Sequence, residues 1–386
     1  MITRFTTVYA GHVDLPDRGQ NETPANERHF SNEHLATVFS KSEHIARTMD
    51  QLGYDTVWFA EHHFQREGYE CVPNIPLLAV HLAHLTKRIK LGCAFNIAPM
   101  WHPLRLAEDF ATADILTGGR TVFGVGRGYH AREVETFGAP MLDQSANREL
   151  FEEQVEVILK AFNEESFSHK GKHYTLPPEV PYRGYTLKEL TLVPRPVHRP
   201  VEIWQPIVSA NPRGLEFMVR NGIKGAVGGG AATLEAGPIT GYRDAAARLG
   251  KELQLGENLQ LGLHLHIART EEQAIREITP IFEEHVKMFA PLGFVPGLTP
   301  EQVAAVARRG GWAAAGIPTV DHYAKSGAWF AGTAAQLVEH LKGLEAKYPG
   351  LEYVSLSSPL GTPESVMIEQ LHWIAEEVMP QFKPRT

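Results

Sequence analysis

The chain has 386 residues, of which 43% are hydrophobic and 21% are charged, and its formal net charge is −8 at pH 7. This length and composition are those of an ordinary globular protein, with enough chain for one large domain or two small ones. The acidic balance argues against a nucleic-acid partner, because proteins that bind phosphate backbones need clustered Lys and Arg. No such cluster occurs in this sequence.

Two cysteines, Cys71 and Cys93, are too few for a disulfide framework in a chain of this length, so reduced thiols are expected. The N-terminal sequence MITRFTTVYAGH lacks the apolar core of a signal peptide. No segment reaches the roughly 18 uninterrupted apolar residues of a membrane span. We therefore expect a soluble, cytoplasmic protein without a membrane partner.

Apolar runs alternate with amphipathic stretches along the chain, which is typical of a parallel sheet with crossover helices. Strands are expected at Ile2–Tyr9, Tyr54–Ala60, Ile89–Phe95, Arg120–Gly126, Val201–Pro206, Ile223–Val227, Leu259–Ala268 and Leu351–Leu356. Helices are expected at Leu35–Leu52, Ile75–Thr86, Leu104–Leu116, Arg148–Phe162, Arg213–Asn221, Leu234–Leu249, Glu271–Phe289, Gln336–Lys347 and Glu364–Val378. Eight successive strand-and-helix units predict a closed (β/α)₈ TIM barrel, formed by residues 1–386 as a single domain.

Three segments do not fit this alternation and are predicted to be insertions that carry function. Ala10–His34 is a long polar loop. Asn163–Pro200 is predicted to hold a hairpin, with KGKHYTL paired to ELTLVPRP. Ala290–Phe330 shows little regularity and is a candidate lid on the barrel rim, with disorder as the alternative.

The run YDTVWFAEHHF passes from an apolar stretch directly to a carboxylate and two imidazoles. An apolar run of this length, bounded by polar residues, is typical of a strand that is enclosed on both faces. In barrels and doubly wound sheets alike, the pocket forms at the carboxyl ends of the strands. Glu61, His62 and His63 are therefore candidates for a functional site at that end.

Neighbouring residues of an extended chain point to opposite sides, so His62 and His63 are not expected to bind one metal together. One imidazole is expected to face the pocket as a general acid or base. A hydrogen-bonded pair without chemical function is the alternative. His264 and His266 are two residues apart on a predicted strand, where a metal site is geometrically possible. Further ligands are not evident, so an interior hydrogen-bonded pair is favoured there.

The stretch GRTVFGVGRGYH places Arg127 between two glycines directly after a predicted strand. Glycine lets the backbone approach a ligand closely, and a guanidinium holds a phosphate or carboxylate through two parallel hydrogen bonds. This pattern predicts an anion site, with a structural salt bridge as the alternative.

The sequence VSANPRG lies between a predicted strand and a predicted helix. Ser209 and Asn211 could hold a phosphate there, since a helix N-terminus favours anions. Alternatively, Asn211 could cap the helix, with Pro212 as its first residue. Gly228–Gly230 and Ser357–Gly361 are weaker candidates for phosphate loops.

In their order and spacing, these segments resemble the bacterial luciferase-like flavin monooxygenases, a superfamily of (β/α)₈ barrels. The resemblance runs through GYDTVWFAEHHF and KRIKLGCAFNIAPMWHPLRLAEDFATADILTGGRTVFGVGRGYHAREVETFG. Agreement is thinner at VSANPRG and WFAGTAAQLVEHL. A series of blocks in order is more specific than any single motif.

The resemblance implies that His62 lies beside the flavin ring as the catalytic residue. It implies that Arg127 and Ser209 bind the FMN phosphate from two sides. It also implies that Ala94 and Phe95 form a non-prolyl cis peptide against which the ring packs. His102 is implied to orient the loop after the third strand and not to take part in the reaction.

Two positions depart from the luciferase pattern. The reactive cysteine of luciferase is Gly126 here, and the glutamate before its phosphate-binding serine is Val208. The first change is expected to widen the space near the flavin, and neither supports light emission. We expect a monooxygenase with a bulkier, apolar, mid-sized substrate. Candidate pocket walls are Tyr9, His12, Trp58, Phe64, Trp101, Tyr129, Trp204, Trp312 and Trp329.

The resemblance implies a two-component enzyme, in which a separate flavin reductase supplies reduced FMN. Oxygen would add to the reduced flavin, and the resulting peroxide adduct would oxygenate a small organic substrate. The lack of a GxGxxG dinucleotide fingerprint after the first strand agrees with a separate reductase. A homodimer through the early helices is implied as well.

Three alternatives remain open at this point. One is the deazaflavin-dependent hydride-transfer branch of the same superfamily, although the EHHF block fits the FMN branch better. Another is a metal-dependent barrel hydrolase that uses the histidine pairs. The last is a noncatalytic flavoprotein that only stores flavin.

Overall fold

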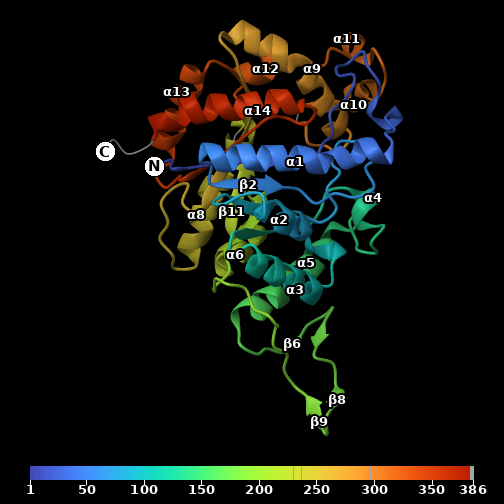
Figure 1. Cartoon of the computed structure of the whole chain (residues 1–386), viewed down its shortest axis with the longest axis vertical. Helices are drawn as coiled ribbons and strands as arrows, with labels where there is room; N and C mark the ends of the chain where they lie inside the picture. The colour runs from blue at the N-terminus through green and yellow to red at the C-terminus, as the bar shows by residue number, and fades with distance from the viewer. Residues whose placement is uncertain (229, 236, 296, 383–386) are drawn as a thin grey trace.

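The computed structural model describes residues 1–228, 230–235, 237–295 and 297–382 (Figure 1). Parallel strands close into an eight-stranded barrel, which confirms the predicted (β/α)₈ TIM barrel. In spatial order they are β1 (Arg4–Tyr9), β2 (Thr56–Phe59), β3 (Lys90–Cys93), β5 (Thr121–Gly126), β10 (Ile203–Ile207), β11 (Lys224–Gly228), β12 (Leu259–Ile267) and β14 (Tyr353–Ser357). Every expected strand is present with shifted ends, and β4 (Asn96–Ile97) pairs with β5 beyond the closed barrel.

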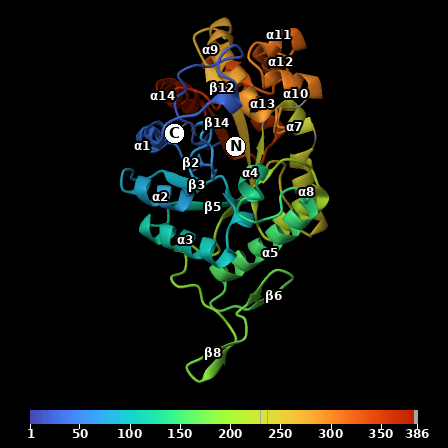
Figure 2. The ribbon, with the colours of Figure 1, turned by 90° about the vertical axis from the view of Figure 1, so that its right-hand side faces the viewer.

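Helices surround the strands, as Figure 2 shows for a view in which the strands lie inside the helical ring. They are α1 (Asn32–Leu52), α2 (Ile75–Ala83), α3 (Pro103–Leu116), α5 (Gln144–Asn163), α6 (Pro212–Arg220), α8 (Pro238–Arg248), α13 (Ala334–Lys347) and α14 (Glu364–Trp373). The predicted helix Leu234–Leu249 is wrong, because the chain forms α7 (Ala231–Glu235) and α8 separately. Gly237 has a φ of 76° and Pro238 follows it, which breaks the helix. No described helix is both long and apolar enough to cross a membrane.

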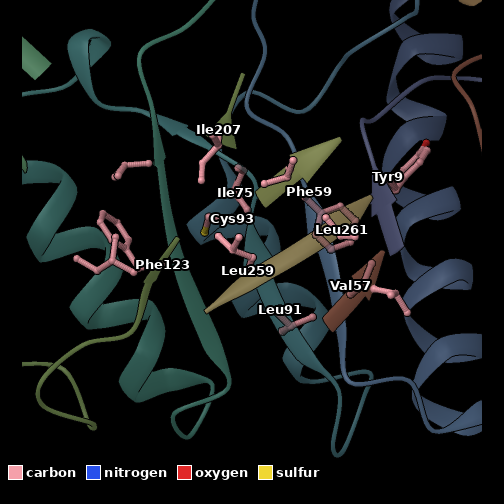
Figure 3. Close-up of a cluster of buried hydrophobic side chains, with 14 of the residues drawn as sticks. Tyr9, Val57, Phe59, Ile75, Leu91, Cys93, Phe123, Ile207, Leu259 and Leu261 are labelled. Carbon is pink, nitrogen blue, oxygen red and sulfur yellow. The ribbon is translucent and has the colours of Figure 1, made fainter. Parts of the chain in front are cut away.

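The core has an inner part and an outer part. Outside the barrel, Phe123 of β5 packs against Phe110 of α3 and Phe162 of α5, with ring centroids 4.7 and 5.1 Å away. Figure 3 shows this side chain with others of the same layer, including Phe59 and Leu91. Burial of each such side chain contributes about 1.5–3 kcal/mol to the free energy of folding.

Tryptophans fill the inside of the barrel. The rings of Trp58 and Trp204 lie 5.7 Å apart. Gly92 makes room for them, because a Cβ atom at that position would lie 2.2 Å from the Trp58 ring. Trp204 also contacts Tyr353, the first residue of β14, at 5.2 Å. Trp204 therefore lies towards the amino ends of the strands, and its predicted place at the rim is wrong.

The predicted insertion Asn163–Pro200 contains two short hairpins, which extend away from the barrel in Figure 1. They pair β6 (His169–Lys170) with β7 (Thr175–Leu176), and β8 (Val180–Tyr182) with β9 (Tyr185–Leu187). The predicted pairing of KGKHYTL with ELTLVPRP is therefore wrong. The Glu153 carboxylate of α5 accepts the backbone N–H groups of Lys172, His173 and Tyr174 at 2.8–3.1 Å. This contact folds KGKHYTL back on itself.

The rim segment between β12 and α13 is more regular than its sequence indicated. It contains α9 (Glu271–Phe289), α10 (Pro300–Val306), α11 (Gly311–Ala315), α12 (Val320–Lys325) and β13 (Phe330–Gly332). The last three helices are too short to leave a periodic apolar pattern. β13 pairs with the end of β12, and Figures 1 and 2 place α9–α12 on the opposite side of the barrel from the hairpins.

A buried carboxylate fixes the polar loop after β1 to this rim segment. Glu284 of α9 has no accessible surface. Its oxygens lie 3.0 Å from Arg28 Nε, 3.2 Å from Lys287 Nζ and 2.5 Å from the Tyr69 hydroxyl. A buried charge is tolerated only with such partners. The loop also contains a short 3₁₀ turn, η1 (Ala25–Glu27), so it is held in place over the barrel.

Both cysteines are free thiols. Burial raises the pKa of Cys71 and of Cys93 to about 12. Since the thiolate is the reactive form, neither side chain is suited to be a nucleophile near neutral pH.

Candidate active site

Glu61 joins the loops that follow β2 and β3. Its buried carboxylate accepts the backbone N–H of Ile97 and the indole N–H of Trp101, both at 2.7 Å. His63 Nε2 lies 3.2 Å from the same carboxylate. These bonds hold the loop after β2 beside the Ala94–Phe95 peptide, which is cis, as the resemblance implies. Glu61 is thus fully used in positioning the two loops.

His62 lies between two carboxylates at the same end of the barrel. Its Nδ1 is 3.2 Å from the nearer Glu133 oxygen, and its Nε2 is 3.0 Å from the Tyr129 hydroxyl and 3.4 Å from Glu70. The Tyr129 hydroxyl donates to Glu70 at 2.7 Å, so it accepts from His62 Nε2. Glu133 comes from the short helix α4 (Ala131–Val134) after β5.

These contacts favour the cationic form of His62. Burial lowers the pKa of this imidazole, but Glu70 and Glu133 outweigh burial and raise the pKa above its ordinary value. Burial acts in the opposite direction on the two carboxyl groups, and the histidines nearby lower the pKa of both. The group is therefore a protonated imidazole with both N–H groups engaged, which suits an acid or hydrogen-bond donor more than a base.

His130 and Gln65 complete the buried cluster. His130 Nε2 is 3.0 Å from Glu70, and the Gln65 amide donates to Glu70 at 2.9 Å and to Glu133 at 3.0 Å. The potential ligand atoms of His62, Glu70 and His130 all lie within 4.8 Å of one another. Hydrogen bonds from these N–H and O–H groups account for the close approach, so the geometry does not require a cation.

The other histidine pairs separate in space. His63 packs against the stacked rings of Phe64 and Phe137, away from the carboxylates that hold His62. On β12, His264 contacts His285 and Trp329, whereas His266 Nε2 is 2.9 Å from Glu277 of α9. Among the described residues, His264 and His266 are not brought together with further metal ligands.

Arg127 lies beside a second arginine that the sequence did not single out. Its guanidinium donates to Asn147 of α5 at 3.1 Å, and the amide of Asn147 donates back to the Arg127 carbonyl at 3.2 Å. Burial and then the nearby charge of Arg148 lower the pKa of Arg127. A Cβ atom on Gly214 would lie 3.2 Å from the Arg148 guanidinium. Arg148 therefore lies over the first turn of α6.

The N-terminus of α6 adds backbone donors to this basic group. Asn211 caps the helix by accepting from Gly214 N–H at 3.2 Å, with Pro212 first in the helix, as the alternative interpretation of VSANPRG predicts. Ser209 is exposed just before the cap. Glu152 is the nearby counter-charge, 2.6 Å from Arg213 and 3.9 Å from Arg148. Positive charge prevails here, in an arrangement typical of anion sites.

Of the weaker phosphate-loop candidates, Gly229 lies outside the described residues. Ser357 is the last residue of β14. Its hydroxyl accepts a hydrogen bond from Val8 N–H of β1 at 3.0 Å, so it binds the neighbouring strand. Thr362, just after the SSPLG stretch, is buried, and its carbonyl lies 2.9 Å from His12 Nε2. This loop therefore packs against the loop after β1.

Gly126 does not open a space near the cis peptide. A Cβ atom there would lie 3.3 Å from Phe95 Cβ and 3.4 Å from Ile97 Cδ1. The expected widening is therefore wrong, because those two side chains already border the position. His102 caps α3 by accepting from Leu104 N–H at 3.3 Å, and its lack of a part in the reaction stays a prediction.

A family model for luciferase-like monooxygenases matches residues 17–372. The chain belongs to this family. The oxygenase component of the flavin-dependent trigonelline monooxygenase of Acinetobacter baylyi is 27% identical over 186 residues, which are 48% of this chain and 47% of that protein. The alkanal monooxygenase alpha chain of the Kryptophanaron alfredi symbiont is 30% identical over 140 residues, 36% of this chain and 38% of that one. The chain thus aligns with less than half of either relative's length.

Solved structures share the fold of this chain over nearly its whole length. The oxygenating constituent of 3,6-diketocamphane monooxygenase from Pseudomonas putida, in complex with FMN, has a TM-score of 0.70, 19% identity, and 98% and 99% coverage of the two chains. An F420-dependent secondary alcohol dehydrogenase has a TM-score of 0.68 with 16% identity and covers 100% of both chains. The fold therefore accommodates both kinds of flavin cofactor and does not choose between them.

Several residues of the candidate site were not predicted from the sequence. Glu70 and Glu133 follow His62 at some distance in the chain and carry no motif of their own. His130 and Glu133 are three residues apart at α4, a spacing that places both on one side of a helical turn. Arg148 lies in the first turns of α5, next to Asn147. The helical spacing in HAREVE could have marked Glu133, but no prediction was drawn from it.

Proposed function

We propose that this chain is the oxygenase component of a two-component system. It would take reduced FMN from a separate flavin reductase and use O₂ to oxygenate a small organic substrate. The observation that carries the proposal is the basic group formed by Arg127, Arg148 and the N-terminus of α6, where Glu152 is the nearby counter-charge. A dianionic phosphate suits this combination of guanidiniums and backbone N–H groups.

The residues at the mouth fit a flavin mononucleotide. Arg127 and Arg148 would hold its phosphate, with Ser209 at the exposed entrance before α6. The cis Ala94–Phe95 peptide would support the ring, next to the loop that carries His62. When bound, reduced FMN supplies the electrons that activate O₂.

His62 is the chain's own group for proton transfer in this proposal. Its cationic ring would release the Tyr129 hydroxyl and donate the Nε2–H to oxygen near the flavin, while Glu133 fixes Nδ1. Tyr129 also touches Phe294 of the rim segment, with ring centroids 5.0 Å apart. These side chains would keep water away from the reacting atoms.

Equilibrium binding of FMN and riboflavin tests the phosphate site directly. Charged hydrogen bonds contribute about 1.5–3 kcal/mol each, so Arg127→Ala and Arg148→Ala should each weaken FMN binding by roughly 10- to 150-fold. Riboflavin lacks the phosphate, and its affinity should stay the same in both variants. Arg105→Ala is the control, because Arg105 pairs with Glu108 on the exposed face of α3.

The activity requires a second measurement. Oxygen uptake with reduced FMN should rise when the right member of a panel of ketones, aldehydes, phenols and thioethers is added. Tight binding of F420 without FMN binding would move the chain to the hydride-transfer branch. Retention of FMN without any substrate-dependent oxygen uptake would indicate a flavin-storage protein.

We also infer a homodimer through the early helices. Large apolar side chains are exposed on this surface: Phe39 of α1 at 42%, Leu77 of α2 at 70%, and Ile115 and Leu116 of α3 at 41% and 58%. Apolar groups gathered on one surface are typical of protein interfaces. Leu77→Lys should shift the chain from dimer to monomer in size-exclusion chromatography with light scattering, and an unchanged mass would contradict this interface.

A further inference from the structure

A second group of histidines lies at the carboxyl ends of β12 and β14, apart from the His62 cluster. His264 pairs in register with Ser357, the last residue of β14. Its ring centroid is 4.8 Å from that of His285 in α9 and 5.1 Å from that of Trp329. His285 also packs on Phe289 at 4.4 Å. Two imidazoles thus meet within a wall of flat aromatic rings.

The nitrogens of these imidazoles lack partners. The Nδ1 atoms of His264 and His285 are enclosed by protein and make no hydrogen bond to any described residue. Both side chains nevertheless keep part of their surface accessible. The accessible part lies away from Nδ1, which leaves Nε2 as the nitrogen that a ligand can reach. No hydrogen bond to either Nε2 atom occurs among the described residues, so both nitrogens can accept a hydrogen bond from a ligand.

His12 borders the same place from the loop after β1. Its Nε2 is 2.9 Å from the Thr362 carbonyl, so this nitrogen carries the proton and donates. Burial and then the charge of Lys41 keep the pKa of His12 well below its ordinary value, and the ring is neutral. Its Nδ1 is therefore an acceptor, and it too has no partner among the described residues.

Among the residues that the structure describes, no carboxylate compensates this group, in contrast to His62. Burial lowers the pKa of His264 to about 4, and burial, His264 and His12 lower that of His285. The charged neighbours of His285 on α9 face elsewhere, because Glu284 binds both Lys287 and Arg28. Their neighbour Glu283 binds Gln20, and His266 of β12 takes Glu277. The basic nitrogens are thus left without a counter-charge.

A ligand that carries a negative oxygen would correct this imbalance. Protonating an imidazole in a dry wall costs free energy because no anion is near, and placing an anion in the same wall costs free energy for the same reason. When the imidazole is protonated and the anion is bound together, their opposite charges stabilise each other, and both costs in free energy are reduced. The flat faces of Trp329 and Phe289 favour a planar ring as the rest of the ligand.

We propose that His264 and His285 form a substrate site for a flat ring with an acidic oxygen, either a phenolic hydroxyl or a carboxylate. A phenol would pass its O–H proton to Nε2 of one imidazole and bind as the phenolate. A carboxylate would bind as the anion while the imidazole takes up one proton from solvent. This inference rests on the proposed oxygenase function, since it names the substrate class of the same barrel mouth.

4-Nitrophenol tests binding through a phenolic hydroxyl, because its phenolate absorbs visible light and the phenol does not. At a pH one unit below the pKa of the free phenol, the purified full-length protein should increase the phenolate band as it binds. Benzoate tests binding through a carboxylate. Calorimetry in two buffers of different ionisation enthalpy should reveal uptake of about one proton when benzoate binds. Nitrobenzene, which has no acidic oxygen, is the neutral control and should bind at least tenfold more weakly.

Both titrations are done with and without FMN, so that the outcome is independent of flavin binding. His264→Asn and His285→Asn keep a polar amide but cannot take up a proton, and each should abolish the phenolate band and the proton uptake. His340→Asn is the matched control, because His340 of α13 is also enclosed, with its Nε2 unpaired among the described residues.

The wild-type protein alone can overturn the proposal, even if the variants fail to fold. Binding of 4-nitrophenol without a phenolate band, together with benzoate binding without proton uptake, would do so. Equal affinity for nitrobenzene would do so too. If the phenolate band appears but FMN does not bind, the oxygenase function fails while the acidic-oxygen site stands.

Discussion

The environment of each histidine decides its chemistry at this barrel mouth. His62 lies between Glu70 and Glu133, and its pKa rises despite burial. His264 lies against other imidazoles and aromatic rings, and burial lowers its pKa to about 4. One fold therefore offers a proton donor on the β2 side and neutral imidazoles on the β12 side.

Glu133→Gln tests the first of these assignments. Glu133 is within 3.2 Å of His62 Nδ1, and loss of its negative charge should lower the pKa of His62. The imidazole then loses its proton at a lower pH, so substrate-dependent oxygen uptake should fall at neutral pH and recover on acidification. A loss of up to about 100-fold is expected, within the range of general acid–base catalysis.

The matched control is Glu67→Gln, because Glu67 pairs with Arg132 on the outer surface at 2.8 Å. NMR titration of the His62 imidazole gives the pKa itself. An activity loss that is equal at every pH, with the His62 titration unmoved, would mean that Glu133 only supports the local structure.

At the scale of elements, the local sequence predicted the strands, but not which side chains meet beyond their carboxyl ends. β2 and the EHH sequence after it were predictable, since a buried strand ends where polar residues begin. Arg127 was predicted as an anion ligand because glycines flank it, and this role stays a prediction. Glu70 and Arg148 were not, because each reaches the site from a separate loop or helix through tertiary packing.

The hairpins and the rim show the same limit. KGKHYTL carries the β-type residues of a strand, but Glu153 of α5 gathers three of its N–H groups and turns the chain back. The loop after β1 looked like a free polar segment, but Arg28 within it is buried against Glu284 of α9. Contacts between segments far apart in the chain decide such regions, and a pattern within one segment does not contain them.

At the scale of the whole molecule, these buried groups predict how stability depends on pH. His12, His264 and His285 have lowered pKa values in the folded state, so the unfolded chain binds more protons than the folded chain below about pH 6.5. Stability should therefore fall as pH decreases from about 6.5 to 4. Glu70 and Glu133 also have lowered pKa values, and their contribution is lost at still lower pH.

His62 acts with the opposite sign, because its raised pKa contributes stability at low pH that is lost as pH rises through that pKa. Three lowered histidines outweigh one raised histidine, so urea unfolding should give a lower free energy at pH 4.5 than at pH 7. For His264 alone, a shift from 6.5 to about 4 corresponds to about 3 kcal/mol. His264→Gln should flatten the pH profile by part of that amount, whereas His81→Gln, on the exposed face of α2, should leave it unchanged. A profile that rises towards pH 4.5 would show that His264 is protonated and paired in the folded protein.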